Sequence, residues 1–189
     1  MEILTFRQIT TADVTDEAFN DGSAWSRVYE YPLVIQEMQT HHASASLVHN
    51  SCWGFAGIHT VFKDHLDANY DAVHSDIRPS DLPNTCVYDI TRAAPAEENN
   101  KYDIVLNIST MEEVNDDHWA CFTNLFAQVK PGGLFIATFD LPGLQLEKFE
   151  SEFGQQMGRE GEALNGKNSV VPNRKRKKLN CGVMTLRKT

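Results

Sequence analysis

The sequence predicts an α/β protein built on a doubly wound, mostly parallel sheet with a late antiparallel strand. Short apolar runs alternate with segments of helical periodicity between residues 43 and 140. Several of these runs are continuously apolar, which is typical of parallel strands covered by helices on both faces. A final apolar run, residues 181–188, follows a long polar stretch, and a strand separated in this way often joins such a sheet antiparallel.

The elements are expected in the following order. Residues 1–22 are polar and predict irregular structure, with at most a short strand at the start. The apolar runs predict strands at 45–50, 70–77, 85–91, 102–110, 134–140 and 181–188. The helical periodicities predict helices at 32–40, 57–66, 116–130 and 144–157. We expect the "PGG" at 131–133 to end the third of these helices through a left-handed glycine.

Composition and charge limit the possible functions. The 189 residues are enough for one domain, and 41% hydrophobic content is ordinary for a globular protein. A formal net charge of −9 argues against affinity for nucleic acid or an anionic membrane. The exception is "RKRKK" at 174–178, which is either a basic lip for a phosphorylated substrate, a solvated hairpin or a nuclear-localisation-like run.

The sequence shows no targeting signal, and its cysteines lack metal-ligand spacing, which together predict a cytoplasmic protein. The N-terminus lacks a basic start and an apolar run, and no stretch approaches the roughly 20 apolar residues that span a bilayer. The four cysteines lack metal-ligand spacing, so we expect free, buried thiols in a reducing compartment. Carboxylates and histidines offer metal ligands, but no spacing specifies a site, and we predict none.

The stretch "LVHNSCWGFAGIH" at 47–59 reads as a strand, a tight turn and a helix. Asn50, Cys52, Gly54 and Gly57 fall at the key positions of an acidic-x-Gly-x-Gly-x-x-Gly loop. Glycine is needed there where a ligand passes close to the backbone or where φ is positive. The alternative is an ordinary strand-to-helix turn.

Two aspartates end the next two predicted strands. Asp76 ends the second, where an acidic residue can accept from ribose hydroxyls, and Asp89 ends the third, followed by apolar Ile90. Each aspartate taken alone is better explained as a helix N-cap or turn residue than as a ligand contact. With Asn50, however, three polar residues end successive strands at one edge of the sheet, which favours a ligand site.

The stretches "LVHNSCWGFAG", "VHSDI", "VYDI", "YDIVLNISTMEEV" and "FAQVKPGGLFIATF" resemble, in this order, the motifs of the class I S-adenosylmethionine-dependent methyltransferases. The resemblance covers residues 25–140, and "VKPGGLFI" is its most specific piece. Three departures stand out: Asn50 replaces the usual acid, Cys52 replaces the first glycine, and Glu113 stands where the family usually has histidine.

This resemblance implies a Rossmann-like methyltransferase fold with an N-terminal cap (1–42), a cofactor-binding core (43–140) and a C-terminal helix with antiparallel strands (141–189). It also implies S-adenosylmethionine as cofactor and S-adenosylhomocysteine as product. The implied cofactor site consists of Arg27, Asn50, Ser51, Cys52, Gly54, Gly57, Asp76, Ile77, Asp89, Ile90 and Asn107. Arg27 would pair with the methionine carboxylate, unless it is a solvent-exposed arginine at a helix start.

Methyl transfer to a hydroxyl benefits from a general base, because an alcohol holds its proton tightly at neutral pH. The candidates are Glu113, Glu112 and His59. The two glutamates could instead be a helix cap and a solvated residue, and His59 could simply pack. The "SRVYEYP" segment is similar to that of enzymes acting on sugars, so the expected acceptor is a small hydroxylated molecule or glycan.

Two other functions fit parts of the sequence. A non-catalytic, methyltransferase-like binding or scaffold module is favoured by the altered first motif. An NAD-dependent oxidoreductase would need a glycine-rich first loop, and Cys52, Trp53 and Phe55 fit that requirement poorly.

Overall fold

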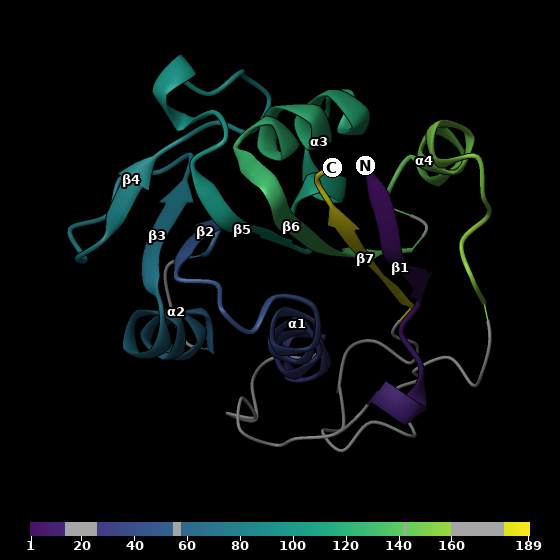
Figure 1. Cartoon of the computed structure of the whole chain (residues 1–189), viewed down its shortest axis with the longest axis horizontal. Helices are drawn as coiled ribbons and strands as arrows, with labels where there is room; N and C mark the ends of the chain where they lie inside the picture. Colours follow the sequence, from purple (N-terminus) through teal and green to yellow (C-terminus); the bar gives the residue numbers. More distant parts are fainter. Residues whose placement is uncertain (14–25, 55–57, 142, 160–179) are drawn as a thin grey trace.

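The computed structural model describes residues 1–13, 26–54, 58–141, 143–159 and 180–189. They form a seven-stranded sheet of order β1-β7-β6-β5-β2-β3-β4 (Figure 1). The strands are β1 (Glu2–Gln8), β2 (Leu47–Ser51), β3 (Asp71–Asp76), β4 (Thr85–Val87), β5 (Tyr102–Ile108), β6 (Val129–Asp140) and β7 (Cys181–Arg187). Strands β2 to β6 pair in parallel, whereas β7 is antiparallel to β6 and β1. The predicted fold class is confirmed.

Helices cover both faces of this sheet. One face carries α1 (Arg27–His42) and α2 (Ile58–Asn69), and the other carries α3 (His118–Ala127) and α4 (Leu146–Phe153) (Figure 1). Strand β5 shows why the central runs are continuously apolar. Ile104 and Leu106 join the cluster under α1 and α2, Val105 joins the one under α3 and α4, and all three are fully buried.

Four local predictions were wrong in extent or type. Residues 2–8 form a full strand, β1, in a segment expected to be largely irregular. Helix α1 begins at Arg27 and contains Pro32, which we expected at its start. Strand β4 ends at Val87, because the chain turns at Asp89, whose carboxylate accepts from the backbone of Thr91.

The fourth difference concerns "PGG". Helix α3 ends at Ala127, and residues 131–133 lie inside β6, where the register against β5 is interrupted. Gly132 has a φ of +81°, as expected for a left-handed glycine. Gly133 passes so close to β5 that an added Cβ would lie 2.6 Å from the carbonyl oxygen of Asp103. The glycines therefore permit a bulge in the strand and do not cap the helix.

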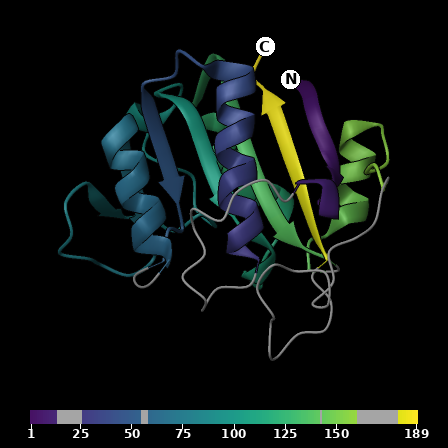
Figure 2. The same cartoon turned by 90° about the horizontal axis from the view of Figure 1, so that it is seen from below.

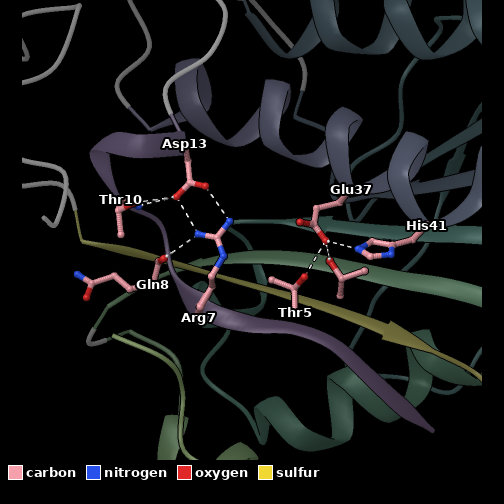
Figure 3. Close-up of polar contacts among 8 residues, drawn as sticks. Thr5, Arg7, Gln8, Thr10, Asp13, Glu37 and His41 are labelled. Atoms are coloured by element: carbon pink, nitrogen blue, oxygen red, sulfur yellow. Dashed lines mark hydrogen bonds and ion pairs between the residues drawn. The ribbon is translucent and has the colours of Figure 1, made fainter. Parts of the chain in front are cut away.

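Polar contacts hold β1 and the chain after it against α1 (Figure 3). Glu37 of α1 accepts hydrogen bonds from the hydroxyls of Thr5 on β1 (3.0 Å) and Thr185 on β7 (2.7 Å). Arg7 forms a two-pronged ion pair with Asp13, with distances of 2.7 and 2.8 Å. Asp13 belongs to the short 3-10 turn η1 (Thr11–Asp13), so this pair fixes the direction in which the chain leaves β1.

The two ends of the chain meet at one edge of the sheet, where the Met1 ammonium group donates to Thr189 Oγ1 at 2.6 Å (Figure 2). The four cysteines are free, as predicted, but they are not uniformly buried: Cys86 is exposed and Cys52 half-buried. Within the described ranges, no helix is both long and apolar enough to cross a membrane. The basic run 174–178 lies outside the described residues.

Candidate active site at the carboxyl edge of the sheet

The carboxyl ends of β2, β3, β5 and β6 lie at one edge of the sheet, opposite the chain termini (Figure 2). Parallel pairing produces this arrangement, because every parallel strand runs in the same direction. Open α/β sheets bind their ligands at this edge, near the point where the strand order reverses. Here that point lies between β2 and β5, which are paired although they are far apart in sequence.

Two side chains link these central strands just below the edge. Asn107 on β5 donates to the Ser51 hydroxyl on β2 (3.0 Å), and Ser51 in turn donates to the carbonyl of Leu106 (2.7 Å). The other end of the Asn107 amide accepts from the backbone of Met111 (3.1 Å). Both predicted cofactor residues are buried, so their polar groups serve to hold the two strand ends and the following turn.

The loop after β2 has the backbone of a glycine turn. Cys52 has a φ of +58° and Gly54 a φ of +72°, both in the left-handed region that favours glycine. A Cβ on Gly54 would lie only 2.8 Å from the ring of His59, whose Nδ1 is 2.6 Å from the hydroxyl of Tyr31 on α1. The loop, α1 and α2 therefore meet at His59. Gly57 lies outside the described residues.

Asp76 and Asp89 act on a common neighbour at this edge. Burial raises the pKa of the Cys52 thiol to about 12, and the charges of Asp76 and Asp89 both contribute to that rise. Asp76 accepts from the backbone of Arg78 (3.2 Å), and Asp89 accepts from the backbone (3.0 Å) and hydroxyl (2.7 Å) of Thr91. These turn bonds use one oxygen of each carboxylate.

The hydrogen bonds with Thr91 lower the pKa of Asp89, and its side chain stays 39% exposed. Its second oxygen lies 3.4 Å from Arg92 Nε, an exposed pair that adds little stability. Beside Asp76, the side chain of Ile77 is 64% exposed, whereas Ile90 is fully packed into the core. Of the two isoleucines that the resemblance assigns to the cofactor, only Ile77 is exposed.

The side chain of Asn50 contacts the neighbouring strand. It is buried, and its Nδ2 lies 3.2 Å from Nδ1 of His74 on β3. Among the described residues, no hydrogen bond joins Asn50 to Asp76 or Asp89, and the convergence of these three side chains on one ligand stays a prediction.

Arg27 is held in a buried ion pair. Its Nη1 lies 2.6 Å from Glu30 Oε2, and its Nη2 donates to the carbonyl oxygen of Ser109 (3.2 Å), just after β5. Glu30, which is fully buried, also accepts from the Ser109 hydroxyl. Ser109 has a φ of +41°, a strained value for a residue with a side chain. We call these three residues the α1 clamp, because they fasten the start of α1 to the end of β5.

The two candidate glutamates have different environments. Glu113 is exposed, whereas one oxygen of Glu112 accepts from the backbone of Asp140 (2.7 Å) and the other is buried without a hydrogen bond among the described residues. Burial raises the pKa of Glu112 to about 8, with contributions from Glu30 and Asp140. The adjacent Glu113 is not among these causes. Neither glutamate caps α3, because Asp117 does so.

A cavity of about 1190 Å³ opens at the same edge, beside the start of α4. Most of its lining side chains carry amides or charges, and three leucines are apolar. The lining residues are Gln8, Asp117, Leu141, Leu144, Gln145, Leu146, Glu147, Lys148, Glu150, Arg159 and Asn180. Among the described residues, no three His, Cys, Asp or Glu side chains are placed to share a metal ion.

No protein-family model matches the chain, and no curated protein matches it. Solved structures do. The 1,6-didemethyltoxoflavin-N1-methyltransferase of Burkholderia thailandensis, solved with S-adenosylhomocysteine, superposes with a TM-score of 0.55 at 14% identity, covering 95% of this chain and 87% of that one. The CMeT domain of the citrinin polyketide synthase gives 0.54 at 11% identity, over 84% of this chain and 51% of that one.

A sugar N-methyltransferase from Streptoalloteichus, KedS8, has a TM-score of 0.48 at 15% identity, with 62% of this chain and 48% of that one covered. The chain thus spans about half the length of that enzyme. At these identities the similarity shows the fold, and the fold is that of the class I S-adenosylmethionine-dependent methyltransferases.

Sequence reasoning missed three residues of this edge: Glu30, Ser109 and His74. Glu30 lies three residues after Arg27, the spacing at which an Arg and a Glu pair on one helix, so this partner could have been proposed. The other two had no signal, because the contacts of Ser109 and His74 join residues distant in sequence.

Replacing Gly54 with alanine should destabilise the protein through contact with His59. We expect a loss of about 2–4 kcal/mol in the free energy of unfolding, since a left-handed residue with a Cβ costs about 1–2 kcal/mol and the clash adds to it. Gly132→Ala is the matched control, because Gly132 has a similar φ but open space around it. Urea denaturation measures both. Equal losses would show that His59 does not pack under the loop.

Removing Arg27 alone should lower the free energy of unfolding more than removing the charges of both Arg27 and Glu30. Arg27→Met leaves the buried Glu30 carboxylate unpaired, and we expect a loss of about 3–5 kcal/mol. Adding Glu30→Gln should recover part of that loss, since no buried charge then remains. Urea denaturation of both variants checks this, and a double variant less stable than Arg27→Met would contradict the buried pair.

Glu112 should make stability fall as pH rises. Its pKa is 4.5 when unfolded and about 8 when folded, so between these values the unfolded chain releases a proton that the folded chain retains. Stability therefore decreases across this window. Glu112→Gln should flatten the decrease, measured as unfolding free energy from pH 5 to 8, whereas the exposed neighbour Glu113→Gln should not. An unchanged slope in Glu112→Gln would contradict the raised pKa.

Proposed function

We propose that this chain is an S-adenosylmethionine-dependent methyltransferase that methylates a hydroxyl of a small molecule, a sugar or glycan. The observation that carries the proposal is the group at the ends of β3 and β4. Asp76 pairs with Val87 at the end of β4, and its carbonyl oxygen accepts from the backbone of Tyr88 (3.0 Å), the residue before Asp89. Ile77, beside Asp76, is exposed. Two carboxylate acceptors and an apolar surface at the carboxyl edge suit the ribose and adenine of an adenosyl group.

The residues present fit the adenosine part of this cofactor better than its methionine part. Asp76 would accept from ribose hydroxyls, Asp89 from the adenine amino group, and Ile77 would pack on the ring. When bound, the cofactor supplies a methyl group on a sulfonium, which an acceptor oxygen attacks as the carbon–sulfur bond breaks. Arg27, by contrast, already pairs with Glu30, so we no longer assign it to the methionine carboxylate.

Glu112 is the best-placed candidate for the general base. A carboxylate with a pKa of about 8 is a stronger base than an ordinary glutamate and is still partly ionised at neutral pH. One of its oxygens is buried without a hydrogen bond among the described residues, and for Glu112 to take the proton an acceptor hydroxyl would have to reach this oxygen. Glu113 and His59 remain second candidates, the latter tied to Tyr31.

The cavity beside α4 supports a polar acceptor. It lies past the end of β6, on the same edge as the cofactor candidates, and amides such as Gln145 and Asn180 can both donate to and accept from hydroxyl groups. Carboxylates and cations, among them Glu147 and Lys148, line it together. This mixture suits a polyhydroxylated molecule better than an apolar one.

A non-catalytic binding module is the second candidate. The specific observation in its favour is that Arg27, expected to contact the cofactor, is paired with Glu30, and that the amide nitrogen of Asn50 is bonded to His74. Calorimetry separates the two functions, since a scaffold need not bind S-adenosylmethionine.

Removing the charge of Asp76 or Asp89 should weaken binding of S-adenosylhomocysteine. We expect Asp76→Asn and Asp89→Asn each to lower affinity by roughly 1–3 kcal/mol, because each loses a charged acceptor while the amide oxygen can still accept from the turn. Asp81→Asn, an exposed acid in the loop after β3, is the control. Titration calorimetry measures all three, and unchanged affinity in both test variants would overturn the assignment.

The acceptor class needs its own assay. Incubation with S-adenosylmethionine and a panel of sugars, glycans and amino sugars should give methylated hydroxyls, and Glu112→Gln should slow transfer while sparing S-adenosylhomocysteine affinity. Methylation confined to amines would replace O-methylation with N-methylation and leave the cofactor assignment standing.

A further inference from the structure

A series of hydrogen-bonded polar side chains, most of them buried, connects the end of β2 to α2. Asn50 Nδ2 is 3.2 Å from His74 Nδ1, and His74 Nε2 is 3.1 Å from Asp67 Oδ1. Asp67 continues the chain to Lys63, whose Nζ is 2.5 Å from Oδ2 and whose side chain is 2% exposed. Asn84, from the loop before β4, also donates to Asp67 Oδ1 (3.0 Å).

The order of donors in this chain is fixed by its chemistry. The carboxylate of Asp67 can only accept, so Nε2 of His74 donates to it. Nδ1 of a neutral His74 then carries no proton and accepts from Nδ2 of Asn50. The amide of Asn50 is consequently oriented, with its carbonyl oxygen left free. Among the described residues, that oxygen accepts no hydrogen bond.

We propose that His74 is a positioning residue, which holds the Asn50 amide so that an acceptor oxygen, not an N–H donor, is available at the start of the loop. This rests on the proposed function, because the ligand group it would receive is an N–H donor of the bound cofactor. An aspartate at position 50 would offer His74 no donor and would instead require its Nδ1 to be protonated. Asn50 and His74 therefore act as a pair.

The pair should respond to pH. Burial lowers the pKa of His74, against the opposing effect of Asp67. The other charged and titratable groups that act on it are Lys63 and Asp64 of α2, together with His49 of β2. Below this lowered pKa, Nδ1 gains a proton and becomes a donor. The Asn50 amide must then reverse, which turns its acceptor oxygen toward His74.

The first test reads the tautomer directly. Long-range proton–nitrogen NMR of the histidine-labelled chain, with the His74 signals assigned by their loss in His74→Phe, should show the Nε2–H tautomer near neutral pH. Asn50→Asp should raise the pKa of His74 by about 1–3 units, since a carboxylate at hydrogen-bond distance favours the charged ring. An Nδ1–H tautomer, or an unmoved pKa in Asn50→Asp, would overturn the pairing.

The second test asks whether His74 acts through Asn50. S-adenosylhomocysteine affinity is measured for the wild type, His74→Phe, Asn50→Leu and the double variant. We expect His74→Phe to weaken affinity about 10-fold in the wild-type background and to have little further effect beside Asn50→Leu. Of the four proteins, only the wild type should lose affinity for S-adenosylhomocysteine as the pH falls through the pKa of His74. Additive losses would mean that His74 is merely structural.

These tests separate the proposed function, binding of the cofactor, from the inference that His74 positions Asn50. If the wild-type chain binds no S-adenosylhomocysteine, the proposed function fails and the cofactor role of this pair fails with it, whereas the NMR result still decides whether His74 orients the amide. If the wild type binds and the four affinities show no coupling, only the present inference fails.

Discussion

The site depends on one constraint: polar groups at the ends of the central strands must be satisfied, either by one another or by a ligand. A buried carboxylate such as Glu30 is tolerable only because Arg27 and Ser109 surround it. This α1 clamp fastens the first helix to the end of β5 and holds Ser109 in a strained conformation. Groups bonded in this way are part of the framework, and what remains unsatisfied or exposed marks where a ligand can bind.

That distinction divides the carboxyl edge into two parts. Near β5 and β6, the clamp and Glu112 are enclosed, and burial gives Glu112 a pKa suited to taking up a proton. Near β3 and β4, Asp89 and Ile77 stay exposed, and the charges of Asp76 and Asp89 both raise the pKa of the Cys52 thiol. A cofactor on the second part and an acceptor in the cavity beside α4 would approach the edge from opposite sides of β2 and β5, the two central strands.

Much of the fold could be predicted from the sequence, because continuous apolar runs such as residues 104–106 occur where helices cover both faces of a strand. The strand Glu2–Gln8 was missed because it lies at the edge of the sheet and pairs with the last strand, a partner nearly the whole chain away. The "PGG" was misread because its glycines serve a bulge and a close approach to Asp103, which only the neighbouring strand reveals. The strand pattern placed Asp76 at the end of β3, and Asp89 lies two residues after β4, but spacing could not show that Asn50 contacts His74.

The central claim is that an adenosyl group binds at the ends of β3 and β4. Backbone amide NMR shifts recorded while S-adenosylhomocysteine is added test it most directly. The account predicts the largest changes at Cys52, Ile77 and Thr91, with small changes at Arg159 and Asn180 beside α4. Changes confined to the α4 cavity, or none at saturating ligand, would contradict it.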